Sequence, residues 1–170
     1  MKKKVIANNI LQTNYVYYLT ESAGRNFDPE FKPDLSPKEM LQLGVFGGHY
    51  FLDENARKEL PKSWWSGVKL SDSGKKEKQY NYFNIRASQP LEVWQKKGWI
   101  NEQDPHGWFQ WYCRYYMGRR SDDDARQIKR WKAFRRHYAQ VAKNCRVGDI
   151  HCRPKQRQAL LHWAYDSRKI

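Results

Sequence analysis

The stretch that decides the fold is Trp108-Phe109-Gln110-Trp111-Tyr112-Cys113-Arg114-Tyr115-Tyr116, which is apolar or aromatic almost all round. Asp104 and Pro105 ahead of it are typical of a helix start, with Asp104 as the N-cap, and Gly118 marks the end. A helix that is apolar on every side has to be buried. The sequence therefore predicts a helix that runs through the middle of the fold.

Two further helices are expected after this one. Ser121 and the three acids that follow it are typical of the start of a helix that ends near Asn144. Its core-facing stripe recurs at intervals of three or four residues: Ile128, Trp131, Phe134, Tyr138 and Val141. A last helix is expected from about Pro154 to Ser167. Residues 104–170 should thus form a basic helical core of three longer helices.

Shorter elements are expected upstream of this core. Residues 1–8 carry three lysines and are expected to be a mobile tail, and residues 14–20 (NYVYYLT) predict a strand. The other expected elements are a capping-box helix from Ser36-Pro37, short helices over residues 53–60 and from Ser88-Gln89-Pro90 to Gly98, and a β-hairpin over residues 68–85. The sequence predicts an α+β fold in which a small N-terminal strand and hairpin region packs on the helical core.

A single domain is expected to account for residues 1–170, because a chain of this length forms one domain with a proper core. Aromatic residues make up 15% of the chain, whereas disordered chains are poor in them. No apolar run approaches the length of roughly 20 residues that a membrane span needs. The lysines near the N-terminus precede no apolar stretch of the kind that a secretion signal has. We therefore expect an intracellular protein, either cytoplasmic or associated with the nucleus or nucleoid.

The three cysteines indicate neither a disulfide framework nor a metal centre. Their number is odd and they include no CxxC pair. Cys145, His151 and Cys152 come closest to a metal site, but their spacing fits no common zinc motif. The sequence predicts three buried or half-buried thiols, no metal and no cofactor.

Three glycines, Gly44, Gly47 and Gly48, raise the question of a phosphate-binding loop. This stretch lacks the spacing and the Lys-Ser/Thr pair of a P-loop. Glycine also permits tight turns with positive φ angles. We expect that second role here.

Charge is the strongest functional signal. The chain has 32 basic and 18 acidic side chains, a net charge of +14. Residues 104–170 alone hold 16 basic and 6 acidic side chains, a net of +10. A field of that size attracts polyanions. Nucleic acid, and DNA above RNA, is the expected partner, and an anionic membrane surface is the next candidate.

The candidate contacts to nucleic acid are cations for the phosphates and loop aromatics for the bases. Arg binds phosphate through its planar fork, and exposed aromatic rings stack on unpaired bases. The candidates are Arg119, Arg120, Arg126, Lys129, Arg130, Arg136, Arg146, Arg153, Lys155 and Arg157, with Trp64 and Trp65 as the aromatic residues. The alternative interpretation of the cations is a solvated helix face.

A glycosylase-like or other base-processing enzyme is the main alternative function. Such an enzyme holds a flipped base beside a catalytic carboxylate. Asp104 and His106 are the candidate catalytic residues, although an N-cap role would explain Asp104 without any chemistry. An RNA-binding module and a basic scaffold for an acidic protein are further alternatives, and the sequence leaves the oligomeric state open.

Several motifs resemble those of a family of small, uncharacterised basic proteins. They are DPHGWFQWYCRYYMGRR (104–120), DDARQIKRW (123–131), RQALLHWAYDSR (157–168) and LGVFGG (43–48). The resemblance covers most of the chain from about residue 36 and implies no catalytic role. The chain does not match the helix-hairpin-helix or Asp-Pro-Tyr-His signatures of well-known DNA glycosylases.

Overall fold

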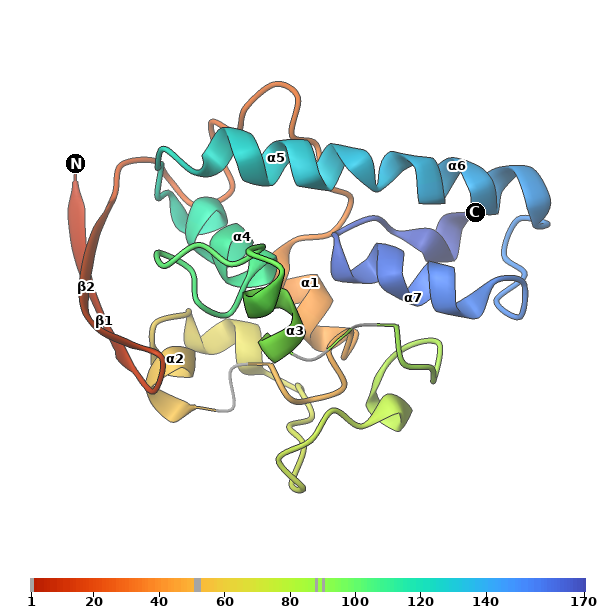
Figure 1. The fold of residues 1–170 in the computed structure, drawn as a ribbon, viewed down its shortest axis with the longest axis horizontal. Helices are drawn as coiled ribbons and strands as arrows, with labels where there is room; N and C mark the ends of the chain where they lie inside the picture. The colour runs from red at the N-terminus through yellow and green to blue at the C-terminus, as the bar shows by residue number, and fades with distance from the viewer. Residues whose placement is uncertain (1, 51–52, 88, 90) are drawn as a thin grey trace. The chain divides into compact units, whose positions relative to one another are not determined.

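The protein has an α+β fold, with a two-stranded antiparallel hairpin at the N-terminus and helices through the C-terminal part (Figure 1). The computed structural model describes residues 2–50, 53–87, 89 and 91–170. The strands are β1 (Lys3–Asn9) and β2 (Gln12–Leu19), and the helices are α1 (Pro37–Gln42), α2 (Glu54–Lys58), α3 (Leu91–Lys96), α4 (Trp108–Met117), α5 (Asp124–Ala133), α6 (Arg135–Asn144) and α7 (Pro154–His162). Short 3-10 turns cover Lys62–Trp65, Lys78–Tyr80 and Ser167–Lys169.

The chain falls into two compact units, each built from three segments that alternate along the sequence. Unit 1 comprises Met1–Lys32, Asp53–Leu60 and Gln89–Arg130, and unit 2 comprises Pro33–Leu52, Pro61–Ser88 and Trp131–Ile170. Because the segments alternate, no single cut in the chain separates the two units. That the chain is a single domain stays a prediction.

The core of unit 1 forms around α4, as the aromatic stretch predicts. Nine of the ten residues of α4 are buried. Phe31 is 1% exposed, and its ring meets those of Trp111, Tyr112 and Tyr115 edge-on, with centroids 5.4–5.6 Å apart. Each such aromatic pair contributes about 0.5–1.5 kcal/mol beyond the area that it buries.

The N-terminal hairpin packs one face inward. Ala7 and Tyr17 are 2% and 4% exposed, whereas the alternate residues Ile6 and Val16 are paired with each other and exposed. The strand predicted over residues 14–20 is confirmed with a start at Gln12. The mobile tail predicted for residues 1–8 is wrong from Lys3 on, because this segment pairs with β2 as β1.

Helix α1 confirms the predicted capping box. The Glu39 backbone N–H donates to Ser36 Oγ, and the Ser36 backbone N–H donates to the Glu39 carboxylate. The helix expected over residues 53–60 is α2, with Asp53 as its N-cap. The expected helix that ends at Gly98 is α3, whose predicted start residues Ser88 and Pro90 lie outside the described residues.

The glycines after α1 allow two backbone segments to touch, and their predicted role in turns is confirmed. Gly44, Gly47 and Gly48 all have positive φ angles. A Cβ atom on Gly44 would lie 1.9 Å from the carbonyl oxygen of Tyr80. In unit 1, a Cβ atom on Gly118 would lie 2.0 Å from the carbonyl oxygen of Glu21. Neither position has room for a side chain.

The β-hairpin predicted over residues 68–85 is wrong. The backbone N–H groups of Ser71 and Glu77 donate to the carbonyl oxygens of Gly48 and Gly47, at 2.8 and 2.9 Å. These donors are therefore used by the glycine loop instead of a strand partner. The segment forms turns and the 3-10 turn Lys78–Tyr80.

The long helix predicted over residues 121–144 is divided at Phe134 into α5 and α6. Trp131 and Val141 from the predicted stripe are buried, and Phe134 and Tyr138 are half-buried. In the core of unit 2, the Tyr165 ring stacks on Trp131 at 5.0 Å, and its hydroxyl donates to the Trp131 carbonyl oxygen at 2.7 Å.

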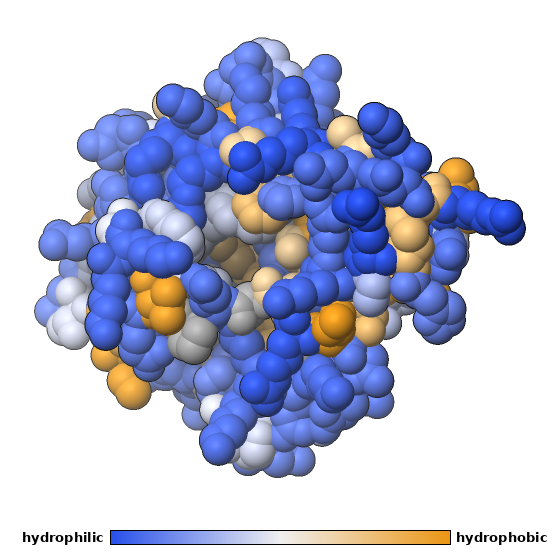
Figure 2. All heavy atoms as spheres, turned by 45° about the vertical axis from the view of Figure 1, so that its right-hand side comes forward, coloured by the Kyte–Doolittle hydropathy of each residue, from blue (hydrophilic) through white to orange (hydrophobic). Residues whose placement is uncertain are grey.

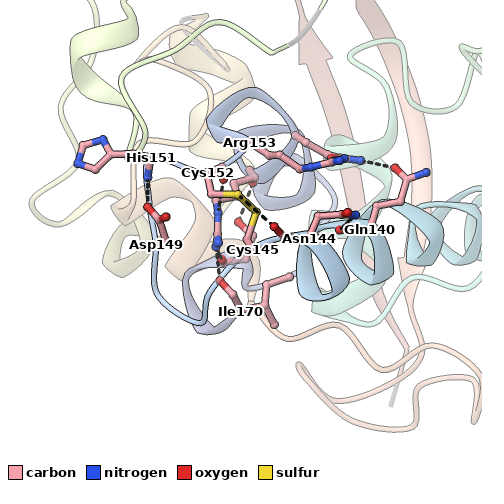
Figure 3. The surroundings of a disulfide bond; sticks show 11 residues. Gln140, Asn144, Cys145, Asp149, His151, Cys152, Arg153 and Ile170 are labelled. Atoms are coloured by element: carbon pink, nitrogen blue, oxygen red, sulfur yellow. Dashed lines mark hydrogen bonds between the residues drawn. A yellow bond between two sulfur atoms is a disulfide. The ribbon is translucent and has the colours of Figure 1, made fainter.

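The expectation of three thiols is wrong for two of the cysteines. Cys145 and Cys152 form a disulfide between the end of α6 and the segment ahead of α7 (Figure 3). Cys113 is a buried thiol in α4. The odd number of cysteines argued against a disulfide, but Cys113 is a core residue and the other two cysteines pair with each other. Among the described residues, no helix is both long enough and apolar enough to cross a membrane.

His162 makes the stability of unit 2 dependent on pH. Its Nε2 atom lies 2.7 Å from the Val45 carbonyl oxygen, and burial, with the charge of Lys76 second, lowers its pKa to about 4. An unfolded histidine takes up its proton at about pH 6.5. Between pH 6.5 and 4 only the unfolded state is protonated, so the folded state loses stability as the pH falls through this range.

We expect His162→Gln, which keeps an N–H donor for Val45, to flatten the dependence of the free energy of unfolding on pH. The measurement is urea unfolding at pH 7 and pH 4.5. His151→Gln, at an exposed position, should leave the wild-type dependence unchanged. An unaltered pH dependence in the His162 variant would contradict the assignment.

Candidate nucleic-acid interface

Helices α6 and α7 form a pair that is held by a polar contact and a disulfide. The Gln156 side-chain amide on α7 donates to Gln140 Oε1 at 2.6 Å and lies 2.9 Å from His137 Nδ1, both on α6. The Arg153 guanidinium donates to Gln156 Oε1 at 3.2 Å. The disulfide, with 5.8 Å between its Cα atoms, closes the connection between the helices.

Six exposed cations lie on α6, on α7 and on the loop between them. The sixth, Arg135, lies over the Trp131 ring, and we call the other five the basic face. Arg136 and Lys143 share one side of α6 with Gln140, because residues four and seven positions apart stack along a helix. They therefore flank the contact that joins Gln140 to Gln156 and Arg153. The basic face consists of Arg136, Lys143, Arg146, Arg153 and Lys155, all of them exposed.

These cations are not neutralised by the protein. Across the ranges that the structure describes, no ion pair joins any residue of the basic face to a carboxylate. Residues 131–165 contain eight basic side chains and one acidic side chain, Asp149. Unit 2 as a whole carries 17 basic and 6 acidic residues, a net of +11, whereas unit 1 carries 15 and 12, a net of +3. The surface drawn in Figure 2 is mainly hydrophilic, and its apolar residues form small separate patches.

The structure places only half of the predicted phosphate contacts on the surface without a carboxylate partner. Besides four members of the basic face, Arg136, Arg146, Arg153 and Lys155, this group includes Lys129 in unit 1. Lys143 belongs with them, although its spacing of seven residues from Arg136 did not single it out in the sequence.

Arg119 and Arg157 are buried, which corrects the expectation that they contact phosphate. Arg119 is 2% exposed and forms an ion pair with Asp104. Arg157 is fully buried and donates to the carbonyl oxygens of Cys152, Ser167 and Ile170. Both guanidinium groups therefore make structural contacts in the interior of the protein.

Three more of the predicted cations are engaged within unit 1. Arg120 donates to the carbonyl oxygens of four residues: Tyr115, Arg119, Arg25 and Asn26. Arg126 is paired with Asp123 at 2.6 Å. Arg130 donates to the Trp99 carbonyl oxygen and Gln127 Oε1, and burial, with the charge of Arg126 second, lowers its pKa to about 10.

The two tryptophans predicted to stack on bases are not exposed. Trp64 is 6% exposed. Trp65 is half-buried and lines a small cavity with residues that include Gly44 and Val45. Their apolar rings pack inside unit 2, although they lie in a loop segment, because a 3-10 turn folds them inward.

Asp104 belongs to a buried ionic network whose centre is Arg114. All five N–H donors of Arg114 are used: two bonds go to Glu59, one to Asp104, one to the Gln103 carbonyl oxygen and one to Gln12, at 2.5–3.1 Å. Arg119 binds both oxygens of Asp104, at 2.9 and 2.6 Å. Two cations thus face two carboxylates in the interior of unit 1.

The N-cap role expected for Asp104 is wrong. Helix α4 begins only at Trp108, with Gly107 as its N-cap. Asp104 is 0% exposed, and its carboxylate is held by two arginines. His106 is half-buried, and burial, with the charge of Arg114 second, lowers its pKa to about 4. Catalysis by Asp104 and His106 stays a prediction, and the ionic network gives Asp104 a structural role.

Other features of the site escaped the sequence analysis. Glu59 and Arg114 lie 55 residues apart in sequence and meet at 2.6 Å, a contact that no local pattern predicts. The six residues between Cys145 and Cys152 include Val147 and Ile150, and the cysteine spacing was the only signal for this closed loop. Among the described residues, no three His, Cys, Asp or Glu side chains come together as a metal site.

We expect Asp104→Asn to lower the free energy of unfolding by about 3–5 kcal/mol, because removing one partner of a buried ion pair leaves an uncompensated charge. Chemical denaturation at pH 7 measures this loss. The exposed carboxylate Asp72 provides the control, since Asp72→Asn should change stability by no more than about 0.5 kcal/mol. Equal stability of the two variants would contradict the structural role.

Comparison of the chain with protein-family models, with curated proteins and with solved structures finds no match. The resemblance of residues 104–120 and the other motifs to a family of small basic proteins therefore stays a prediction.

Proposed function

We propose that this protein binds nucleic acid, with DNA preferred to RNA, through the basic face on α6, the connecting loop and α7. The partner interacts with Arg136, Lys143, Arg146, Arg153 and Lys155 through its phosphates. Phosphate contacts of this kind supply affinity and position the protein without reading sequence.

One observation carries the proposal: the five cations of the basic face are exposed and lack carboxylate partners within the described residues. Four other arginines are paired with carboxylates: Arg114 with Glu59, Arg119 with Asp104, Arg126 with Asp123 and Arg168 with Asp166. Clustered cations repel one another and are costly to hold together on a fixed scaffold. An external polyanion relieves that repulsion and releases its own counterions.

The triple variant Arg136→Gln, Lys143→Gln and Lys155→Gln tests this proposal. Each lost phosphate contact lowers the slope of log K against log salt by about 0.9 for duplex DNA. We expect the slope to fall by roughly 2–3 and the affinity to fall alike for all sequences. Fluorescence anisotropy of a labelled duplex, titrated between 50 and 200 mM salt (about the range over which such affinities change steeply), measures both quantities.

A control with the same loss of charge is Lys2→Gln, Lys3→Gln and Lys4→Gln, because these residues are exposed in unit 1. If both triple variants weaken binding equally, net charge alone is responsible and the basic face is not the site. Matched single-stranded DNA and RNA probes test the preference for DNA. Strand breaks after hot alkali would favour the base-processing alternative.

A further inference from the structure

The loop between the two cysteines is a preorganised structure, and we call residues 146–151 the clipped loop. Its backbone makes two successive turns, in which Asp149 N–H donates to the Arg146 carbonyl oxygen and Cys152 N–H to that of Asp149, both at 3.1 Å. The buried Arg157 guanidinium fixes one end by donating to the Cys152 carbonyl oxygen at 2.8 Å. Figure 3 shows the disulfide across the base of the loop, with His151 pointing away from it.

The clipped loop carries apolar side chains into the solvent. Val147 is 84% exposed and Ile150 is 43% exposed. Single exposed apolar residues are common on proteins. Here Val147 and Ile150 lie on one loop of six residues that the disulfide closes. Arg146 precedes Val147 inside this loop, and Arg153 follows Cys152 just outside it.

We propose that the clipped loop is a wedge, in which Val147 and Ile150 insert at a base step of duplex DNA while the basic face binds the flanking phosphates. This inference rests on the proposed function and adds how the duplex is engaged. Apolar wedges of this type partly unstack a base step and bend the duplex. The cations beside the loop make nucleic acid the occupant that fits, since an apolar protein partner would leave them unpaired.

A wedge has to be rigid to unstack bases, and the structure supplies that rigidity. The disulfide holds the two ends of the loop together, with 5.8 Å between its Cα atoms. The two turns and the Arg157 bond hold the backbone on either side of Ile150. Steps that are already mismatched or flexible cost less to open. The wedge should therefore favour a duplex with a central mismatch over a fully paired duplex.

The experiment compares these two duplexes, each with a donor and an acceptor dye at its ends. We expect wild-type protein to bind the mismatched duplex about tenfold more tightly, a ratio that corresponds to 1.4 kcal/mol, and to shorten the distance between the dyes. The variant Val147→Ser with Ile150→Ser should lose this preference and the bend. Its affinity for the paired duplex and its salt slope should change little, because the basic face is intact.

Ile10→Ser with Leu11→Ser is a closely matched control, because these residues are 81% and 42% exposed at the turn of the hairpin in unit 1. Cys145→Ser with Cys152→Ser should weaken the mismatch preference while Val147 and Ile150 remain. Thermal melting checks that each variant is folded.

The outcomes separate the two proposals. If the variant Val147→Ser with Ile150→Ser binds both duplexes as the wild type does, the wedge is overturned and the proposed function stands. Binding to neither duplex at low salt overturns both. Loss of the mismatch preference in the Ile10 and Leu11 variant as well would also overturn the wedge, because any exposed apolar pair would then suffice.

Discussion

Unit 1 depends on one constraint: every N–H donor of the buried Arg114 guanidinium needs a hydrogen-bond acceptor. Arg114 bonds to Gln12 in the first segment of the unit, to Glu59 in the second and to Asp104 in the third. A buried cation is tolerated only when it is paired and hydrogen-bonded, so the three segments have to meet at this point. The aromatic residues of α4 contribute the apolar area, and Arg114 fixes which segments share it.

The two units use their cations in opposite ways. In unit 1 Arg114, Arg119 and Arg126 are paired with carboxylates. The unit also has nearly as many acidic as basic residues, so its net charge is small. In unit 2 one arginine, Arg157, is placed inside, where it organises the C-terminal segment and the end of the clipped loop. The cations of the basic face remain outside. Much of the protein's excess charge is thus presented on a helix pair whose geometry is fixed by neutral contacts, chiefly those of Gln156.

Elements that depend on neighbouring residues were predictable from the sequence, whereas those that depend on distant partners were not. The capping box at Ser36 and the buried helix at Trp108 follow from patterns within a few residues. Arg119 and Arg157 look like surface cations until the partners of each are known. Most of those partners lie 5–15 residues away, but Arg119 also donates to the Tyr15 hydroxyl, 104 residues away. The hairpin at residues 68–85 failed for the same reason, because its backbone donors are used by a distant loop. On α6, Arg136 was a candidate from the sequence but Lys143 was not. The clipped loop depended on a disulfide that cysteine counting argued against.

The two glycines without room for a side chain, Gly44 and Gly118, also bear on the history of this protein. Each has a positive φ angle and touches the backbone of a distant segment, one in unit 2 and one in unit 1. Surface lysines and arginines can be exchanged over evolutionary time without disturbing a fold, but these two positions accept no other residue while the backbone keeps its course. Descendants of a common ancestor that retain this architecture should share both glycines long after their surfaces have diverged.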